Sequence, residues 1–266
     1  FLTLVTRQSF SFRQMSSSST ISTDQVIANL KKVKENIAQS VKEHNLSESP
    51  RLVAVSKTKP NALIEACYAQ GQRVFGENYF QEMVEKSTQL PDDIEWHFIG
   101  KLQSNKCNKI VQVPNLSAVE TIDSLKLARK LNNAVSKVFK DLRQEKPLSV
   151  FVQVNVSGEQ SKGGVEPGDE CIQLVKEIVE NCPYLYFQGL MTIGDPTNSR
   201  NATPDEKQPD FERLVQCRKE TQAKVMKDEK SRKVELSMGM SADYQTAIAY
   251  GSTNVRVGST IFGARS

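Results

Sequence analysis

The chain has 266 residues, of which 38% are hydrophobic, 25% charged and 7% aromatic, a composition typical of a globular protein with a full hydrophobic core. The formal net charge is +4, and it falls to +2 over residues 24–266 because Arg7 and Arg13 lie in a segment without acids. So small a charge argues against a nucleic-acid partner.

Residues 1–23 differ in composition from the rest of the chain. Eleven of them are Ser or Thr, two are Arg, and no acid precedes Asp24, so the segment resembles an organelle transit peptide. The apolar stretch at residues 1–5 is too short to span a membrane, and we expect no membrane partner. We interpret residues 1–23 as a disordered leader or transit-like segment and residues 24–266 as the domain. Five widely spaced cysteines form no zinc or redox motif, so we expect no bound metal. They favour reduced thiols in the cytoplasm, or in the mitochondrion if the leader is a genuine address.

A regular pattern of apolar residues begins at Asp24. Apolar residues recur at helical spacing between residues 26 and 41, after the capping residues Ser22 and Thr23, and predict a helix at the start of the domain. Strand-like apolar runs follow at residues 51–57, 73–78, 96–100, 116–121, 149–157, 185–194, 233–241 and 254–263. Helix-like segments between them include residues 61–71, 123–139, 170–182 and 211–225.

Eight strands that alternate with helices predict a parallel sheet, and the domain is about as long as a (β/α)8 barrel of about 250 residues. We therefore predict an α/β fold, a single (β/α)8 TIM-type barrel with an extra N-terminal helix. The alternative is an open doubly wound sheet, but no glycine-rich dinucleotide turn follows the first strand. We expect the polar segment 195–210 to flank the barrel mouth as a mobile loop. The strand ends expected to line that mouth are Lys57, Glu77, Asn78, Gly100, Thr121, Asn155, Thr192, Gly194, Ser241 and Gly258.

The first and last predicted strands carry complementary chemistry. Lys57 ends the first strand, and a neutral lysine amine can form a Schiff base with an aldehyde. Lys59 lies two residues further along and would face the same side of an extended strand, so its position cannot exclude it as the reactive amine. Gly258 and Ser259 stand at a strand-to-helix turn, where backbone N–H groups can bind phosphate oxygens. Pyridoxal 5'-phosphate (PLP) is a phosphorylated aldehyde that fits both features. The plainer interpretation is that Gly258 is a turn residue and Arg256 forms a surface ion pair.

Six motifs support a more specific interpretation. In chain order they are VSKTKP, FGENY, WHFIGKLQSNK, GLMTIG, ELSMGMSADY and VRVGSTIFGAR. In this order and spacing they resemble the pyridoxal phosphate homeostasis proteins over residues 51–265. The resemblance implies a single barrel like the N-terminal domain of alanine racemase, with PLP as the cofactor, bound covalently through Lys57.

The resemblance also implies roles for other residues. Gly258 and Ser259 would hold the phosphate, and Ser241 would add a hydroxyl. Arg256 would face the pyridine nitrogen; because a guanidinium keeps its proton, the ring would stay unprotonated and be a weaker electron sink. Asn78 lies at the mouth end of the second strand, where it can hydrogen-bond the ring-side oxygen or orient the Schiff base.

Other polar residues receive structural interpretations. Glu77 is expected to pair outside the barrel lining, because it lies on the opposite face from Asn78. His97 is expected to be a core histidine with satisfied hydrogen bonds, and Lys59 to have a surface role. We interpret the basic stretch at residues 101–109 as a solvated helix face, with a docking surface for a partner enzyme as the alternative.

The resemblance implies a PLP carrier that takes part in intracellular vitamin B6 homeostasis, and the guanidinium of Arg256 favours a role without catalysis. By the same resemblance, racemases take a second base from a separate domain. We expect that domain to be missing here, so that only Tyr79 or Tyr244 could substitute locally. We expect a monomer whose partners are PLP and PLP-dependent apoenzymes. The alternatives are a PLP-dependent amino-acid racemase or lyase, and a Schiff-base aldolase that acts on a sugar phosphate.

Overall fold

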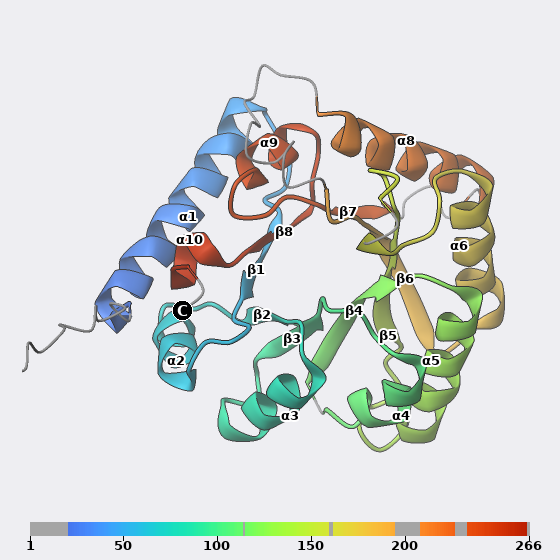
Figure 1. Cartoon of the computed structure of the whole chain (residues 1–266), viewed down its shortest axis with the longest axis horizontal. Coiled ribbons are helices and arrows are strands. Elements are labelled where there is room, and N and C mark those ends of the chain that lie inside the picture. Colours follow the sequence, from blue (N-terminus) through green and yellow to red (C-terminus); the bar gives the residue numbers. More distant parts are fainter. Residues whose placement is uncertain (1–20, 114, 160–161, 195–207, 227–232, 265–266) are drawn as a thin grey trace, which may run out of the picture.

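The protein folds as a closed barrel of eight parallel strands, in which consecutive strands pair and β8 pairs with β1 (Figure 1). The computed structural model describes residues 21–113, 115–159, 162–194, 208–226 and 233–264. Residues 1–20 of the predicted leader and residues 195–207 of the predicted loop lie outside these ranges. The strands are β1 (Arg51–Val55), β2 (Val74–Glu77), β3 (Glu95–Phe98), β4 (Leu116–Ile122), β5 (Leu148–Gln153), β6 (Leu185–Met191), β7 (Glu235–Ser237) and β8 (Asn254–Val257). The predicted α/β barrel and all eight of its strands are confirmed.

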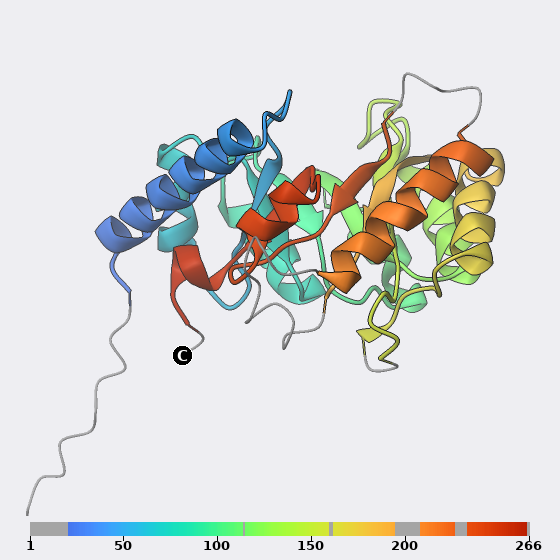
Figure 2. The same cartoon turned by 90° about the horizontal axis from the view of Figure 1, so that it is seen from above.

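Helices cover the outside of this barrel. They are α1 (Thr23–Glu43), α2 (Asn61–Ala69), α3 (Phe80–Gln89), the 3-10 turn η1 (Ser104–Lys106), α4 (Cys107–Ile110), α5 (Leu125–Val138), α6 (Asp169–Asn181), α8 (Pro209–Lys224), α9 (Tyr244–Ala249) and α10 (Ser259–Phe262). Figure 2 shows α6 and α8 side by side at the end of the molecule opposite α1. Across the described ranges, no helix combines the length and the apolar character needed to cross a membrane.

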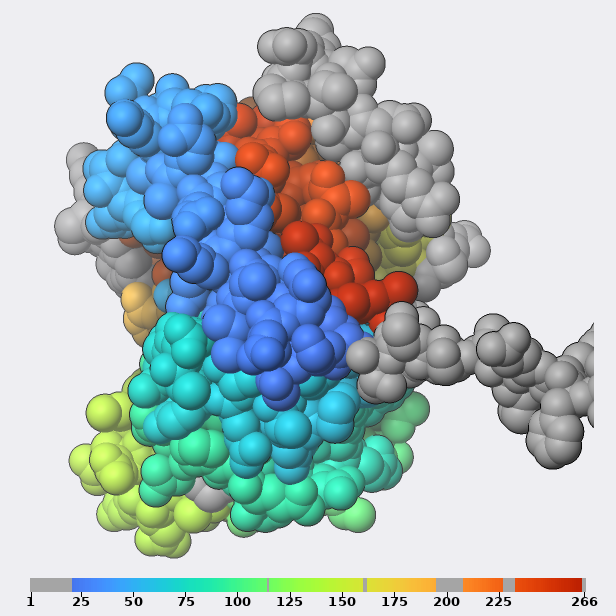
Figure 3. All heavy atoms as spheres, turned by 90° about the vertical axis from the view of Figure 1, so that its left-hand side faces the viewer, coloured from blue at the N-terminus to red at the C-terminus, as the bar shows by residue number. Residues whose placement is uncertain are grey.

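Helix α1 is the predicted extra N-terminal helix. The Ser22 side chain caps it by accepting a hydrogen bond from the Gln25 N–H. Its buried stripe, which includes Val26, Leu30 and Val33, follows the helical spacing in the sequence. This stripe packs against α2, α9 and α10, so that α1 lies along the C-terminal segment of the chain (Figure 3). The helix therefore supports the turn between β8 and α10 from outside.

The strands are nearly continuous apolar runs because a helix-covered parallel barrel buries both faces of each strand. Outside the barrel, the rings of Phe75 and Trp96 pack beneath the helices with their centroids 6.0 Å apart. A separate small cluster of buried residues consists of Ala118, Phe151 and Met191. All five cysteines are buried free thiols, in agreement with the predicted reduced state.

Candidate functional site

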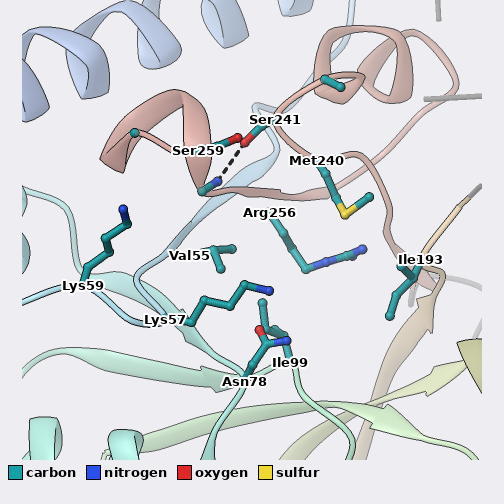
Figure 4. A pocket seen from close by; sticks show the side chains of 13 residues that line it. Val55, Lys57, Lys59, Asn78, Ile99, Ile193, Met240, Ser241, Arg256 and Ser259 are labelled. Atoms are coloured by element: carbon teal, nitrogen blue, oxygen red, sulfur yellow. Dashed lines mark hydrogen bonds between the residues drawn. The ribbon is translucent and has the colours of Figure 1, made fainter. Parts of the chain in front are cut away.

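A pocket of about 500 Å³ opens at the carboxyl ends of the strands (Figure 4). It brings together all six residues that we predicted for the site, from β1, β2, β8 and the segment after β7. The lining residues are Val55, Lys57, Lys59, Asn78, Ile99, Ile193, Met240, Ser241, Ala242, Arg256, Gly258, Ser259 and Gly263. The apolar members were not predicted, because nothing distinguishes them in the sequence from ordinary core residues.

The two lysines enter the pocket differently. Lys57 lies two residues after the end of β1, and its half-buried side chain extends into the pocket near Asn78 and beneath Arg256 (Figure 4). The Lys59 amine points to another side, where it donates a hydrogen bond to the Ala264 carbonyl over 2.9 Å. Lys59 therefore lies at the rim of the pocket, where its amine makes an exposed contact.

Asn78 and its neighbour Glu77 face opposite sides of β2. The Oδ1 atom of Asn78 is buried without a hydrogen-bond partner in a residue that lines the pocket. A buried acceptor without a partner is costly, so a polar ligand that donates to it would be favoured here. Glu77 turns outward and pairs with Lys86 on α3 over 2.8 Å, as we predicted. Burial raises the pKa of Glu77, and Lys86 opposes this shift.

Arg256 projects from β8 and is only 4% exposed. Its guanidinium donates to the Ser237 hydroxyl and to the Thr192 carbonyl, which leaves part of it facing the pocket. Burial lowers the pKa of this guanidinium, and the carboxylate of Glu120, 3.9 Å away, opposes that shift. Arg256 is therefore a buried cation inside the barrel, and the surface ion pair that we considered is excluded.

Glu120 is the counter-charge that the sequence analysis missed. It is fully buried, its Oε1 lies 2.6 Å from Nδ1 of His97, and its Oε2 accepts from the Ser237 hydroxyl over 2.5 Å. Burial by itself would raise the pKa of Glu120, but interactions with His97 and Arg256 outweigh burial and hold the pKa below its usual range. The predicted core role of His97 is confirmed. A carboxylate among the buried residues of β4 was the signal that could have revealed this network.

A turn rich in backbone donors lies on the side of β8. Ser241 Oγ accepts from the N–H groups of Gly258 and Thr260, at 3.0 and 3.3 Å. Having accepted two hydrogen bonds, this hydroxyl can still donate its own proton to a ligand. A Cβ atom at Gly258 would lie 3.3 Å from the Cβ of Val55, tighter than most such contacts, so glycine lets the turn approach β1 closely.

The pocket does not extend around the whole barrel mouth. Several predicted strand ends form hydrogen bonds within the barrel mouth instead: the Thr121 hydroxyl donates to the Gly100 carbonyl, and the Thr192 hydroxyl to the Val154 carbonyl. Asn155 likewise donates to the Glu159 carbonyl. Our expectation that every strand end lines the site was therefore wrong. The site lies mainly on β1, β2, β8 and the segment that follows β7.

Comparison with known proteins identifies the family of the chain. Residues 28–266 match the family model of the alanine racemase N-terminal domain. A pyridoxal phosphate homeostasis protein of Mus musculus is 48% identical over 244 residues, which cover 89% of this chain and 85% of the mouse protein. The chain belongs to the pyridoxal phosphate homeostasis protein family. A family member from Caenorhabditis elegans is 49% identical over 234 residues, or 87% of this chain and 92% of that protein.

Solved structures agree with this family assignment. PipY of Synechococcus elongatus, determined with PLP bound, has 32% sequence identity and a TM-score of 0.71, with coverage of 90% of this chain and 100% of PipY. The alanine racemase of Streptomyces coelicolor has a TM-score of 0.67 and 17% identity, with coverage of 91% of this chain and 59% of the racemase. At that identity the racemase shows only that the barrel is shared.

Proposed function

We propose that this protein binds PLP as a Schiff base on Lys57 and takes part in intracellular PLP homeostasis. The observation that carries the proposal is a single pocket holding the Lys57 amine, the buried Arg256 guanidinium and the hydroxyl-lined turn at Gly258. The names of the family members and the PLP-bound structure of PipY support it. PLP supplies a reactive aldehyde that a carrier must keep from reacting elsewhere.

Each predicted residue has a role that its contacts allow. The N–H group of Ser259, next to Gly258, and the hydroxyls of Ser241 and Ser259 would hold the phosphate, since the N–H groups of Gly258 and Thr260 already donate to Ser241. Arg256 would donate a hydrogen bond to the pyridine nitrogen, since a guanidinium keeps its protons at ordinary pH. Asn78 would meet the ring-side oxygen or the linkage; its side-chain carbonyl, now without a partner, fits a donor on the ligand.

We further propose that the protein carries PLP without catalysing a reaction. The described residues that line the pocket include lysines and an arginine but no tyrosine, histidine or carboxylate. Tyr79 is 54% exposed and does not line the pocket. The Tyr244 hydroxyl accepts a hydrogen bond from Asn36 on α1, on the outer side of the barrel. Neither tyrosine is placed to serve as the second base of a racemase.

One observation favours a racemase or lyase as the second candidate. The Lys59 amine lies at the pocket rim and could exchange a proton with a bound amino acid. Incubation with α-deuterated amino acids separates the two functions. A carrier retains the deuterium, whereas loss of deuterium at rates typical of enzymes, about 1 per second or faster, would support catalysis.

The decisive test of PLP binding is the visible absorbance of the purified protein, followed by borohydride reduction and peptide mapping. We expect a yellow protein with the cofactor mass trapped on Lys57. A colourless protein that PLP cannot reconstitute would contradict the proposal and favour an aldolase acting on sugar phosphates. Transfer of PLP to apoenzymes, and the monomeric state that we propose, are tested by reactivation of an apoenzyme and by light scattering.

A further inference from the structure

The pocket contains two lysines separated by one residue, and the backbone between them decides how they point. In an extended strand, residues two apart project to the same side, so Lys57 and Lys59 would compete for one aldehyde. Instead, the Lys59 N–H donates to the Ser56 carbonyl over 3.0 Å, which closes a four-residue turn. Thr58, at the third position of this turn, has a φ of +60°. The turn separates the two amines.

This turn has an unfavourable residue at its critical position. A turn with positive φ at the third position normally has glycine or asparagine there, and a β-branched residue in that conformation is a genuine outlier. Such strain persists only where the surroundings hold it. Here the Thr58 N–H donates to Oε1 of Glu82 on α3, over 2.5 Å. Helix α3 therefore supplies a contact that holds the strained conformation.

A buried ion cluster fixes Glu82 in turn. We call Glu77, Glu82 and Lys86 the α3 clamp. The Lys86 ammonium, with its side chain 6% exposed, donates to Oε1 of Glu82 over 2.7 Å and to Oε1 of Glu77 over 2.8 Å. It also donates to the Ser56 carbonyl over 2.8 Å. The clamp thus holds the first residue of the turn through Lys86 and the third through Glu82.

The clamp lies outside the pocket, yet it adjoins two pocket residues. Ser56 precedes Lys57, and Glu77 precedes Asn78; the Ser56 hydroxyl donates to Oε1 of Glu77 over 2.6 Å. The clamp therefore connects Ser56 and Glu77, the residues immediately before the pocket residues Lys57 and Asn78. None of the three clamp residues lines the pocket in the part of the chain that the structure describes.

From this geometry we infer that Glu82 is a positioning residue that selects Lys57 over Lys59 as the amine that binds the aldehyde. The inference rests on the proposed function. While Glu82 holds Thr58, the turn directs Lys57 into the pocket and leaves Lys59 at the rim on the Ala264 carbonyl. Without that contact, Thr58 relaxes toward a negative φ, the turn opens, and the two amines reach the same space.

The test compares trapping at the two lysines. The full-length protein is incubated with PLP, reduced with borohydride, and analysed by fragment-ion mass spectrometry for the ratio of Lys57 to Lys59 adducts. We expect Glu82→Ala to lower this ratio by about tenfold, the order expected when one strained backbone residue is released. Glu85→Ala removes an exposed acid from the same helix and should leave the ratio unchanged. Glu82→Gln keeps an acceptor oxygen and should give an intermediate ratio.

A rescue variant distinguishes positioning from general destabilisation. Glycine adopts positive φ without strain, so Thr58→Gly should restore the wild-type ratio in the Glu82→Ala background. A merely structural role for Glu82 would lower the melting temperature without moving the ratio, and glycine would rescue nothing. An unchanged ratio in Glu82→Ala and Glu82→Gln overturns the inference.

A second readout needs no cofactor. Hydrogen exchange of the Lys59 N–H reports closure of the turn, and we expect it to accelerate in Glu82→Ala and to recover in the double variant. If the wild-type protein forms no adduct at all, the proposed function fails, and this exchange measurement still decides whether Glu82 holds the turn. Unchanged exchange in Glu82→Ala overturns that part of the inference.

Discussion

Replacing Glu120 by glutamine tests whether Arg256 depends on a buried counter-charge. The variant keeps the shape of the side chain but removes the charge that lies 3.9 Å from the guanidinium. It also replaces one carboxylate oxygen of Glu120 by an NH2 group. The replaced oxygen is either the one that accepts from the Ser237 hydroxyl or the one beside His97. Glu120 and Arg256 are both at least 96% buried, so water cannot replace the lost charge or the lost hydrogen bond.

The magnitude follows from the burial of this pair. Leaving one partner of a buried ion pair without its counter-charge costs about 3–5 kcal/mol, and the hydrogen bond lost at Ser237 or at His97 is part of that cost. Such a loss is a large fraction of the roughly 5–15 kcal/mol by which a domain is stable. With a urea m-value of about 3 kcal/mol/M, the unfolding midpoint should fall by roughly 1–2 M at neutral pH.

The pH dependence of the stability difference between wild type and Glu120→Gln provides an independent test. Because the pKa of Glu120 is lowered in the folded protein, its contribution is complete above the unfolded carboxyl value of about 4.3 and is lost as pH falls through the folded value. The stability difference between wild type and Glu120→Gln should therefore shrink on acidification below about pH 4. Glu180→Gln, at a mostly exposed position, serves as the control. A midpoint unchanged at pH 7, or a difference that grows in acid, would refute the reasoning.

Three further predictions concern the pocket and the thiols. Lys57→Ala should abolish the covalent PLP adduct and change stability by less than about 1 kcal/mol, as borohydride trapping and urea titration would show; an unchanged adduct would move the anchor elsewhere. Arg256→Ala should speed PLP dissociation without abolishing the adduct, and an unchanged rate in stopped-flow release would argue against contact with the ring. Burial raises the pKa of Cys67 and of Cys171 to about 12, so neither thiol should react with a disulfide reagent at pH 8 until the protein unfolds; rapid labelling of the native protein would contradict this.

The sequence predicted the barrel well because its strands are buried on both faces. Their continuous apolar runs, such as the one at residues 51–57, stand out against the amphipathic helices between them. The polar ends of four strands did converge on one pocket. The pocket's other members, such as Ile99 and Ile193, could not be predicted, since their role depends on which strand ends pair with one another.

The choice between the two lysines shows where sequence reasoning stops. Strand parity treats Lys57 and Lys59 alike, and nothing in the local sequence predicts a left-handed threonine between them. The contact that accompanies this conformation comes from Glu82, 24 residues further along. Glu120 presents the same difficulty, because its partners lie on β3, β7 and β8 and meet only when the barrel closes.

Lys57 and Arg256, the two residues proposed to bind PLP, are held in place by separate contacts, and this separation can be tested. Arg256 is held from inside the barrel by a fully buried carboxylate, so its support cannot be removed without a large loss of folding free energy. The turn that contains Lys57 is held from outside by Glu82, whose side chain is 22% exposed. Loss of Glu82 should therefore cost less stability than loss of Glu120 while changing which lysine reacts. Equal destabilisation by the two substitutions would show that the clamp serves the fold more than the site.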